Sequence, residues 1–183
     1  PYIIGITGSV GKTSCRMIIT QVVQKLLPEQ HIETSQKNFN SELGLALSIL
    51  QIESYDPTLL WTLKAIVQIS GRLLRTEKPY DSIVLEYGID YIGEMDIELS
   101  IVRPHISIFT MIDKVHAMNI WTVEQILAEK AKLLQAAREV VCIPRELEEI
   151  LKPYLAEIKN DYITYSFQES EEWAAAFSDY TLI

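Results

Sequence analysis

The sequence predicts an α/β fold, a doubly wound and mostly parallel sheet that carries a phosphate-binding loop. Two observations support this prediction. Short apolar runs alternate with longer segments of helical pattern along the 183 residues. The first apolar run, residues 2–6, ends in a glycine-containing loop, and a helical pattern over residues 14–27 follows at once. Because the chain is 48% hydrophobic and shows no repeat or linker, we expect one domain over residues 1–183.

The other strands are also short apolar runs, and the helices are longer segments in which apolar residues recur at helical spacing. Prolines end two helices, at Pro28 and at Asp56-Pro57, and Thr58 is placed to cap the next one. The expected strands are residues 2–6, 32–35, 82–86, 106–110, 140–143 and 162–165. The expected helices are residues 14–27, a segment that begins at 41–42 and stops before Asp56, and then 59–75, 93–100, 123–137 and 145–158.

The helix expected at residues 59–75 is unusually apolar. A membrane span needs about 20 consecutive apolar residues, and Lys64, Gln68 and Arg72 interrupt this segment, so no span is expected. We expect the helix to pack on the sheet. A helix that faces a membrane surface or a partner protein is the alternative.

Composition narrows the function classes. The net charge is −9, and an acidic chain without a basic cluster argues against nucleic acid as a partner. Cys15 and Cys142 are isolated and form no metal-ligand spacing, so a reducing, cytoplasmic setting is expected, with both residues acting as small buried side chains. The sequence shows no signal peptide, and its opening directly on a core strand suggests a piece of a longer protein.

The glycine-containing loop is the clearest motif, reading Thr7-Gly8-Ser9-Val10-Gly11-Lys12-Thr13. Glycines let the backbone turn tightly and aim N–H groups at an anion, and the N-terminus of the following helix adds partial positive charge. Lys12 would reach the terminal phosphates of a nucleotide and the Thr13 hydroxyl would bind Mg²⁺. Ile6 stands where the full phosphate-loop pattern has its first glycine, so only the shorter Gly-x-x-Gly-Lys-Thr form is present. A glycine turn that binds nothing is the alternative, but the strand before the loop and the helix after it favour nucleotide binding.

Two further residues follow predicted strands and therefore belong to the same edge of the sheet. Glu86 ends the strand at 82–86, and His116 lies beyond the strand at 106–110. Together with Thr13 they could bind Mg²⁺, although histidine is an unusual ligand for this ion. Glu86 could also be a helix-capping or solvated acid, and His116 a surface or core histidine. On the helix at 123–137, periodicity does not distinguish Lys130 from Lys132.

Several segments follow one another along the chain: the loop at 7–13, Asn38-Phe39-Asn40-Ser41-Glu42-Leu43-Gly44, Glu86-Tyr87-Gly88, Gly93-Glu94-Met95-Asp96, Ser100-Ile101-Val102-Arg103-Pro104-His105-Ile106, His116 and Glu129-Lys130-Ala131. In this order they resemble the central ATP-binding domain of the Mur ligase family, over residues 2 to about 143. The Asn38-Phe39-Asn40 segment resembles most closely the branch that adds D-alanyl-D-alanine to UDP-N-acetylmuramoyl-tripeptide.

The resemblance implies a role for each matching residue. Lys12 and the loop amides of residues 7–13 would hold the ATP phosphates. Thr13 and Glu86 would bind one Mg²⁺, and His116 would help to bind a second. Lys130 matches a lysine that is carbamylated in this family, which turns a cation into a carboxylate-like metal ligand.

The resemblance also implies substrates and a reaction. Asn38 and Asn40 match positions that line the site for the UDP-MurNAc-peptide. ATP would activate a peptide carboxylate as an acyl phosphate, which an amine then attacks, in a peptidoglycan-precursor pathway of the cytoplasm. The two domains that flank the central one in this family, a UDP-binding and a C-terminal domain, are absent from the sequence, so we expect the isolated chain to be inactive.

Two departures from the family keep other functions open. Lys114 places a cation beside the proposed metal site, and Ile143-Pro144-Arg145-Glu146 stands where the family has a nucleotide-contacting Asn and Asp pair. One alternative is a ligase of the same superfamily for another acid, similar to folylpolyglutamate synthase. The other is a non-catalytic nucleotide-binding module that acts through partner proteins.

Overall fold

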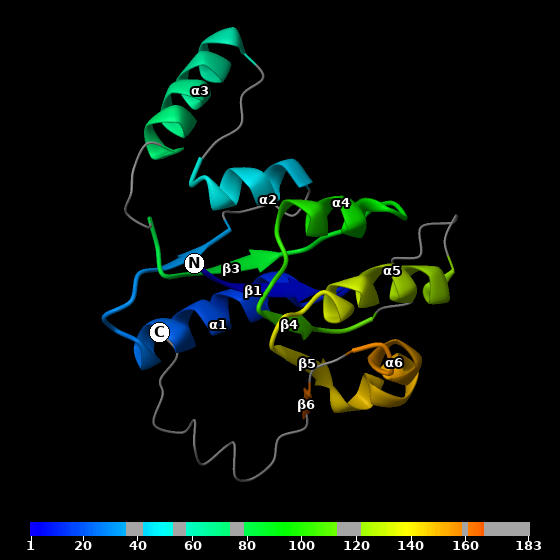
Figure 1. The fold of residues 1–183 in the computed structure, drawn as a ribbon. Coiled ribbons are helices and arrows are strands. Elements are labelled where there is room, and N and C mark those ends of the chain that lie inside the picture. Colours follow the sequence, from blue (N-terminus) through cyan, green and yellow to red (C-terminus); the bar gives the residue numbers. More distant parts are fainter. Residues whose placement is uncertain (36–41, 53–57, 74–78, 113–121, 159–160, 167–183) are drawn as a thin grey trace.

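The computed structural model describes residues 1–35, 42–52, 58–73, 79–112, 122–158 and 161–166. Within them, six strands form one sheet in the order β2-β3-β1-β4-β5-β6, and every pairing of neighbouring strands is parallel (Figure 1). Helices cover both faces of this sheet. The predicted α/β class and doubly wound parallel sheet are therefore confirmed.

The elements follow the predicted alternation closely. The strands are β1 (Tyr2–Thr7), β2 (Ile32–Thr34), β3 (Ser82–Glu86), β4 (Ile106–Phe109), β5 (Val140–Pro144) and β6 (Tyr162–Tyr165). The helices are α1 (Lys12–Leu26), α2 (Glu42–Ile49), α3 (Leu59–Leu73), α4 (Glu94–Ile101), α5 (Val123–Gln135) and α6 (Glu148–Leu155), with a 3₁₀ turn, η2 (Arg145–Leu147), before α6.

The register places the carboxyl ends of the central strands side by side. β1 lies between β3 and β4, with Ile6 opposite Glu86 on one side and Thr7 opposite Phe109 on the other. Ligands of open parallel sheets gather beyond this edge, so the loop after β1 and the end of β3 share one location.

Alternation along the strands divides the core between the two faces of the sheet. Ile4, Ile6 and Val84 face α1. Ile3, Ile83 and Leu85 face the other side, where residues of α2, α4 and α5 complete the cluster, and α5 and α6 cover β4 and β5 on that side. Both faces are buried, which is why the strands read as continuous apolar runs.

The prediction that the helix at 59–75 packs on the sheet is wrong. Ala65 of α3, with Trp61 and Ile69, packs against Leu47 of α2, and α3 stands beyond α2, away from the sheet (Figure 1). Its opposite side exposes Leu63, Ile66 and Val67. In the described part of the chain no helix is both long and apolar enough to cross a membrane.

Candidate active site

The loop between β1 and α1 has the backbone that its glycines predict. Gly8 has φ +145° and Gly11 has φ +84°, and Gly11 is the residue that caps α1. Both conformations favour glycine. The first turn of a helix offers N–H groups that have no acceptor within the helix, so the start of α1 is suited to an anion.

Thr110, at the end of β4, holds this loop in place. It is buried, its N–H donates to the Thr7 carbonyl at 2.8 Å, and its hydroxyl donates to the Val10 carbonyl at 2.7 Å. The Ser9 N–H donates to the Met111 carbonyl at 2.7 Å. Sequence reasoning missed Thr110, although its position directly after the strand that neighbours β1 was a usable signal.

Thr110 leaves no room for a side chain at Gly8, which a substitution can test. A Cβ at Gly8 would lie 2.0 Å from the Thr110 hydroxyl oxygen, and the backbone there disfavours any side chain. We expect Gly8→Ala to lower the free energy of unfolding by about 1–3 kcal/mol, measured by urea denaturation. Gly71→Ala on α3 is the control, because its Cβ would meet nothing within 4 Å and helix propensity should add about 0.5–1 kcal/mol. Equal stability of Gly8→Ala and the unaltered protein would contradict the role assigned to this glycine.

Lys12 folds back over the loop. Its ammonium donates to the Gly8 carbonyl at 2.8 Å, and burial is the main cause that lowers its pKa, against the opposing charges of Glu86 and other acids. A desolvated cation held at the loop is suited to phosphate. The Thr7 hydroxyl is buried and donates to the Tyr87 carbonyl at 3.1 Å, so it joins two strand ends.

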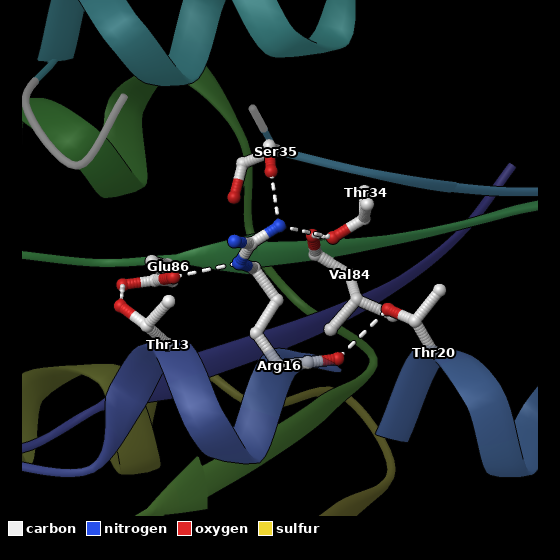
Figure 2. Close-up of polar contacts among 7 residues, drawn as sticks. All are labelled: Thr13, Arg16, Thr20, Thr34, Ser35, Val84 and Glu86. Carbon is white, nitrogen blue, oxygen red and sulfur yellow. Dashed lines mark hydrogen bonds and ion pairs between the residues drawn. The ribbon is translucent and has the colours of Figure 1, made fainter. Parts of the chain in front are cut away.

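Thr13 and Glu86 meet as the sequence predicts, and a third residue joins them (Figure 2). The Thr13 hydroxyl donates to Glu86 Oε2 at 3.2 Å, and Arg16 Nε forms a buried ion pair with Glu86 Oε1 at 2.6 Å. Arg16 also donates through Nη1 to the Thr34 hydroxyl at 2.9 Å and to the Ser35 carbonyl. Sequence reasoning missed Arg16. Its signal was a charge three residues after Thr13, on the same face of the helix.

The donor chemistry here suits Mg²⁺ bound together with a nucleotide. A hydroxyl and a carboxylate oxygen lie within hydrogen-bond distance of each other, and Mg²⁺ usually takes one or two such protein ligands plus phosphate oxygens. Among the residues that the structure describes, no three His, Cys, Asp or Glu side chains gather as a metal site. Phosphate oxygens of a bound nucleotide and water molecules are the further ligands that Mg²⁺ usually takes.

The structure distinguishes Lys130 from Lys132, which periodicity cannot do. Lys130 is buried, and burial, reinforced by the charge of Lys12, lowers its pKa to about 8. Lys132 is partly exposed and pairs with Asp96 at 2.6 Å and with Glu129 at 2.7 Å. Lys130 is therefore the buried lysine of α5, and the charge of Lys12 acts on its amine.

Glu129 fixes the orientation of α5 that buries Lys130. One of its carboxylate oxygens accepts from the N–H groups of Gly93 and Met95, at 2.8 and 3.1 Å, at the start of α4. A carboxylate at a helix N-terminus is favourable because of the helix dipole. The predicted residues His116, Asn38 and Asn40 lie outside the described residues.

Comparison with known proteins gives consistent matches. A family model described as the Mur ligase middle domain matches residues 6–182. A UDP-N-acetylmuramoyl-tripeptide–D-alanyl-D-alanine ligase from Borreliella burgdorferi is 28% identical over 140 residues, covering 76% of this chain and 24% of the relative. The ligase with the same name from Bacillus subtilis is 26% identical over 179 residues, covering 93% of this chain and 33% of the relative.

Two solved structures share the fold. MurF ligase from Thermotoga maritima in complex with ADP has a TM-score of 0.62 at 16% identity, covering 92% of this chain and 33% of that one. MurF from Acinetobacter baumannii has a TM-score of 0.59 at 20% identity, covering 89% of this chain and 30% of that one. The chain thus spans about a quarter to a third of the length of these relatives.

Proposed function

Because the chain belongs to the Mur ligase family, whose middle domain it represents, we propose that it is the ATP-binding domain of an amide-forming ligase. The observation that carries the proposal is the grouping of Lys12, Thr13 and Glu86 around the loop after β1, with the buried amine of Lys130 near Lys12. A phosphate loop, two oxygen ligands and a weakly basic lysine suit ATP-dependent activation of a carboxylate.

The proposed substrates are ATP, a UDP-MurNAc-tripeptide and D-alanyl-D-alanine. The names of the relatives from Borreliella and Bacillus support the tripeptide and the dipeptide as substrates. The ADP complex of the Thermotoga protein supports ATP. The chain is one middle domain, and we propose that flanking domains of the same protein bind the UDP group and deliver the amine. Asn38 and Asn40 are the proposed contacts to the UDP-MurNAc-peptide.

The proposed reaction has two steps. A carboxylate oxygen of the tripeptide attacks the γ-phosphorus of ATP, and the bond to the β,γ-bridging oxygen breaks, giving an acyl phosphate and ADP. The dipeptide amine then attacks the acyl carbon, loses a proton and displaces inorganic phosphate. Lys12 and the N-terminus of α1 would offset negative charge on the transferring phosphoryl group.

Metal ions fit this site as partners of the nucleotide. Thr13 and Glu86 would hold one Mg²⁺, which would supply further positive charge beside the phosphates. His116 and Lys130 are the proposed ligands of a second. Lys130 would serve as its carbamate, formed when the neutral amine adds to CO₂ and loses a proton. Its lowered pKa, about 8, supports this modification because more of the amine is neutral near physiological pH.

Calorimetric titration with a non-hydrolysable ATP analogue, with and without Mg²⁺, tests the proposal. We expect binding that Mg²⁺ strengthens, and at least about a tenfold weaker affinity in Lys12→Ala, because a charge-assisted contact to phosphate is lost. Lys25→Ala is the matched control, a lysine in the last turn of the same helix. Unchanged affinity in Lys12→Ala, or no binding by the unaltered chain or its full-length protein, would contradict the proposal.

A further inference from the structure

We propose that Arg16 is a positioning residue that holds Glu86 in place for the divalent cation of the nucleotide. This inference rests on the proposed function, because it assigns a role within the same site. It concerns a residue that neither the loop motif nor the family resemblance singled out.

The two oxygens of the Glu86 carboxylate have different partners. Oε1 pairs with Arg16 Nε at 2.6 Å, and Oε2 accepts from the Thr13 hydroxyl at 3.2 Å (Figure 2). Arg16 therefore occupies one oxygen and leaves the other directed at the threonine proposed to bind the metal. Both side chains are buried, at 8% exposure for Arg16 and 9% for Glu86, so water can do little to orient the carboxylate.

A second set of contacts holds Arg16 itself. Its Nη1 donates to the Thr34 hydroxyl at 2.9 Å and to the Ser35 carbonyl, at the carboxyl end of β2. The guanidinium thus joins α1, β2 and β3. Because its donors lie in one rigid plane, anchoring one nitrogen on β2 fixes the direction in which Nε meets Glu86.

The place of Arg16 on α1 is itself unusual. Among the fifteen residues of α1, all of them described, Arg16 is the one that is buried, while the apolar neighbours Met17 and Ile18 are exposed. Thr13 and Arg16 are three residues apart, so both side chains reach the same carboxylate from one face of the helix. An arginine is rarely buried without a partner that requires it.

Arg16 could act on a metal ion in two opposing ways. Its fixed positive charge repels a cation, whereas its ion pair orients the carboxylate that binds one. Mg²⁺ demands near-ideal octahedral geometry, and the nucleotide phosphates supply a large excess of negative charge beside it. We therefore expect orientation to dominate, as for other residues that orient metal ligands, whose loss weakens metal binding by about 10–100-fold.

The experiment measures how strongly Mg²⁺ improves the affinity for a non-hydrolysable ATP analogue. The quantity is the ratio of the dissociation constants in EDTA and in Mg²⁺, obtained by calorimetry on the full chain. We expect Arg16→Met to reduce this ratio by about tenfold or more and to leave the affinity in EDTA unchanged. Arg16→Lys should reduce this ratio less than Arg16→Met does, because lysine keeps the positive charge but lacks the planar guanidinium. Arg138→Met, at an exposed arginine, should keep the ratio of the unaltered chain.

Two further variants, Glu86→Gln and the double variant Arg16→Met with Glu86→Gln, complete a double-mutant cycle for the pair. If Arg16 acts through Glu86, the double variant should be no weaker in Mg²⁺ than Glu86→Gln alone. The affinity in EDTA reports whether each variant keeps a folded loop, and Arg16→Lys tests the same inference if Arg16→Met does not fold.

The outcomes separate this inference from the proposed function. If the unaltered chain binds no nucleotide, the proposed function fails and the inference falls with it. If Glu86→Gln loses the Mg²⁺ effect while Arg16→Met and Arg16→Lys keep it in full, the inference is overturned and the proposed function stands. A larger Mg²⁺ effect in Arg16→Met would also overturn the inference, because Arg16 would then be a competing cation.

Discussion

Replacing Lys130 by alanine should abolish ligation by the full-length protein, with a loss of about a hundredfold or more in rate, whereas Lys132→Ala should keep most of the activity. The two lysines lie on the same helix but in different surroundings. Lys130 is buried near Lys12, whereas Lys132 is bound to Asp96 and Glu129 at the edge of α4. The expected loss reflects the removal of a proposed metal ligand beside the transferring phosphoryl group.

The measurement is the rate of product formation from ATP, UDP-MurNAc-tripeptide and D-alanyl-D-alanine, monitored through the release of inorganic phosphate. Added bicarbonate should not restore Lys130→Ala, because no amine remains to be carbamylated. An active Lys130→Ala enzyme would exclude the carbamate as an essential ligand. Equal losses in Lys130→Ala and Lys132→Ala would show that the effect comes from disturbance of α5 rather than from chemistry at Lys130.

The same lysine should make stability depend on pH, with a difference of about 2 kcal/mol between pH 7.5 and 9.5. The pKa of Lys130 in the folded chain is about 8, below its ordinary value of 10.5. Between these values the unfolded chain binds more protons than the folded one, so the free energy of unfolding rises with pH. Lys130→Met removes this contribution. We expect the variant to be the more stable protein at pH 7.5, and its advantage to shrink by about 2 kcal/mol by pH 9.5.

Urea denaturation at several pH values, in buffers freed of CO₂, measures this difference. CO₂ must be absent because a carbamate would change the charge of the residue being tested. Lys152→Met is the control, since Lys152 lies exposed on α6 and pairs only with the neighbouring Glu149 in the described contacts. A constant gap between the unaltered chain and Lys130→Met across this range would show that burial does not lower the pKa of Lys130.

The fold could be predicted largely because its signals are local. Each strand is an apolar run bounded by polar or turn residues, and in each helix apolar residues recur at helical spacing. The alternation of strands and helices could therefore be identified from the sequence, and it predicted a parallel sheet. The observed helix boundaries differ from the predicted ones where backbone geometry determines where a helix begins. Helix α1 begins at Lys12, two residues before the predicted start, because Gly11 in the left-handed conformation caps it. The helix predicted at 145–158 begins as a 3₁₀ turn over Arg145–Leu147.

The contacts that organise the site were less predictable because they join distant parts of the chain. The loop motif identified Lys12 and Thr13, and the strand-end pattern identified Glu86. The role of Arg16 depends on partners 70 residues away at Glu86 and 19 residues away at Ser35. The burial of Lys130 depends on how α5 is rotated against α4, which Glu129 fixes through N–H groups 34 and 36 residues earlier. The spacing of apolar residues within α5 alone does not determine how the helix is rotated against α4.

The position of β1 at the centre of the sheet has a consequence for synthesis on the ribosome. β1 pairs with β3, where Tyr2 lies opposite Ser82, and with β4, where Ile4 lies opposite Ile106. The partners of β1 are thus made 80 residues (82 − 2) and 102 residues (106 − 4) later. At about 5–20 residues per second, β1 waits roughly 4–16 s for its first partner. The loop that would bind phosphate therefore cannot form when it is made. It is completed only when Thr110 arrives at the end of β4, which is made 100 residues after Val10 of the loop.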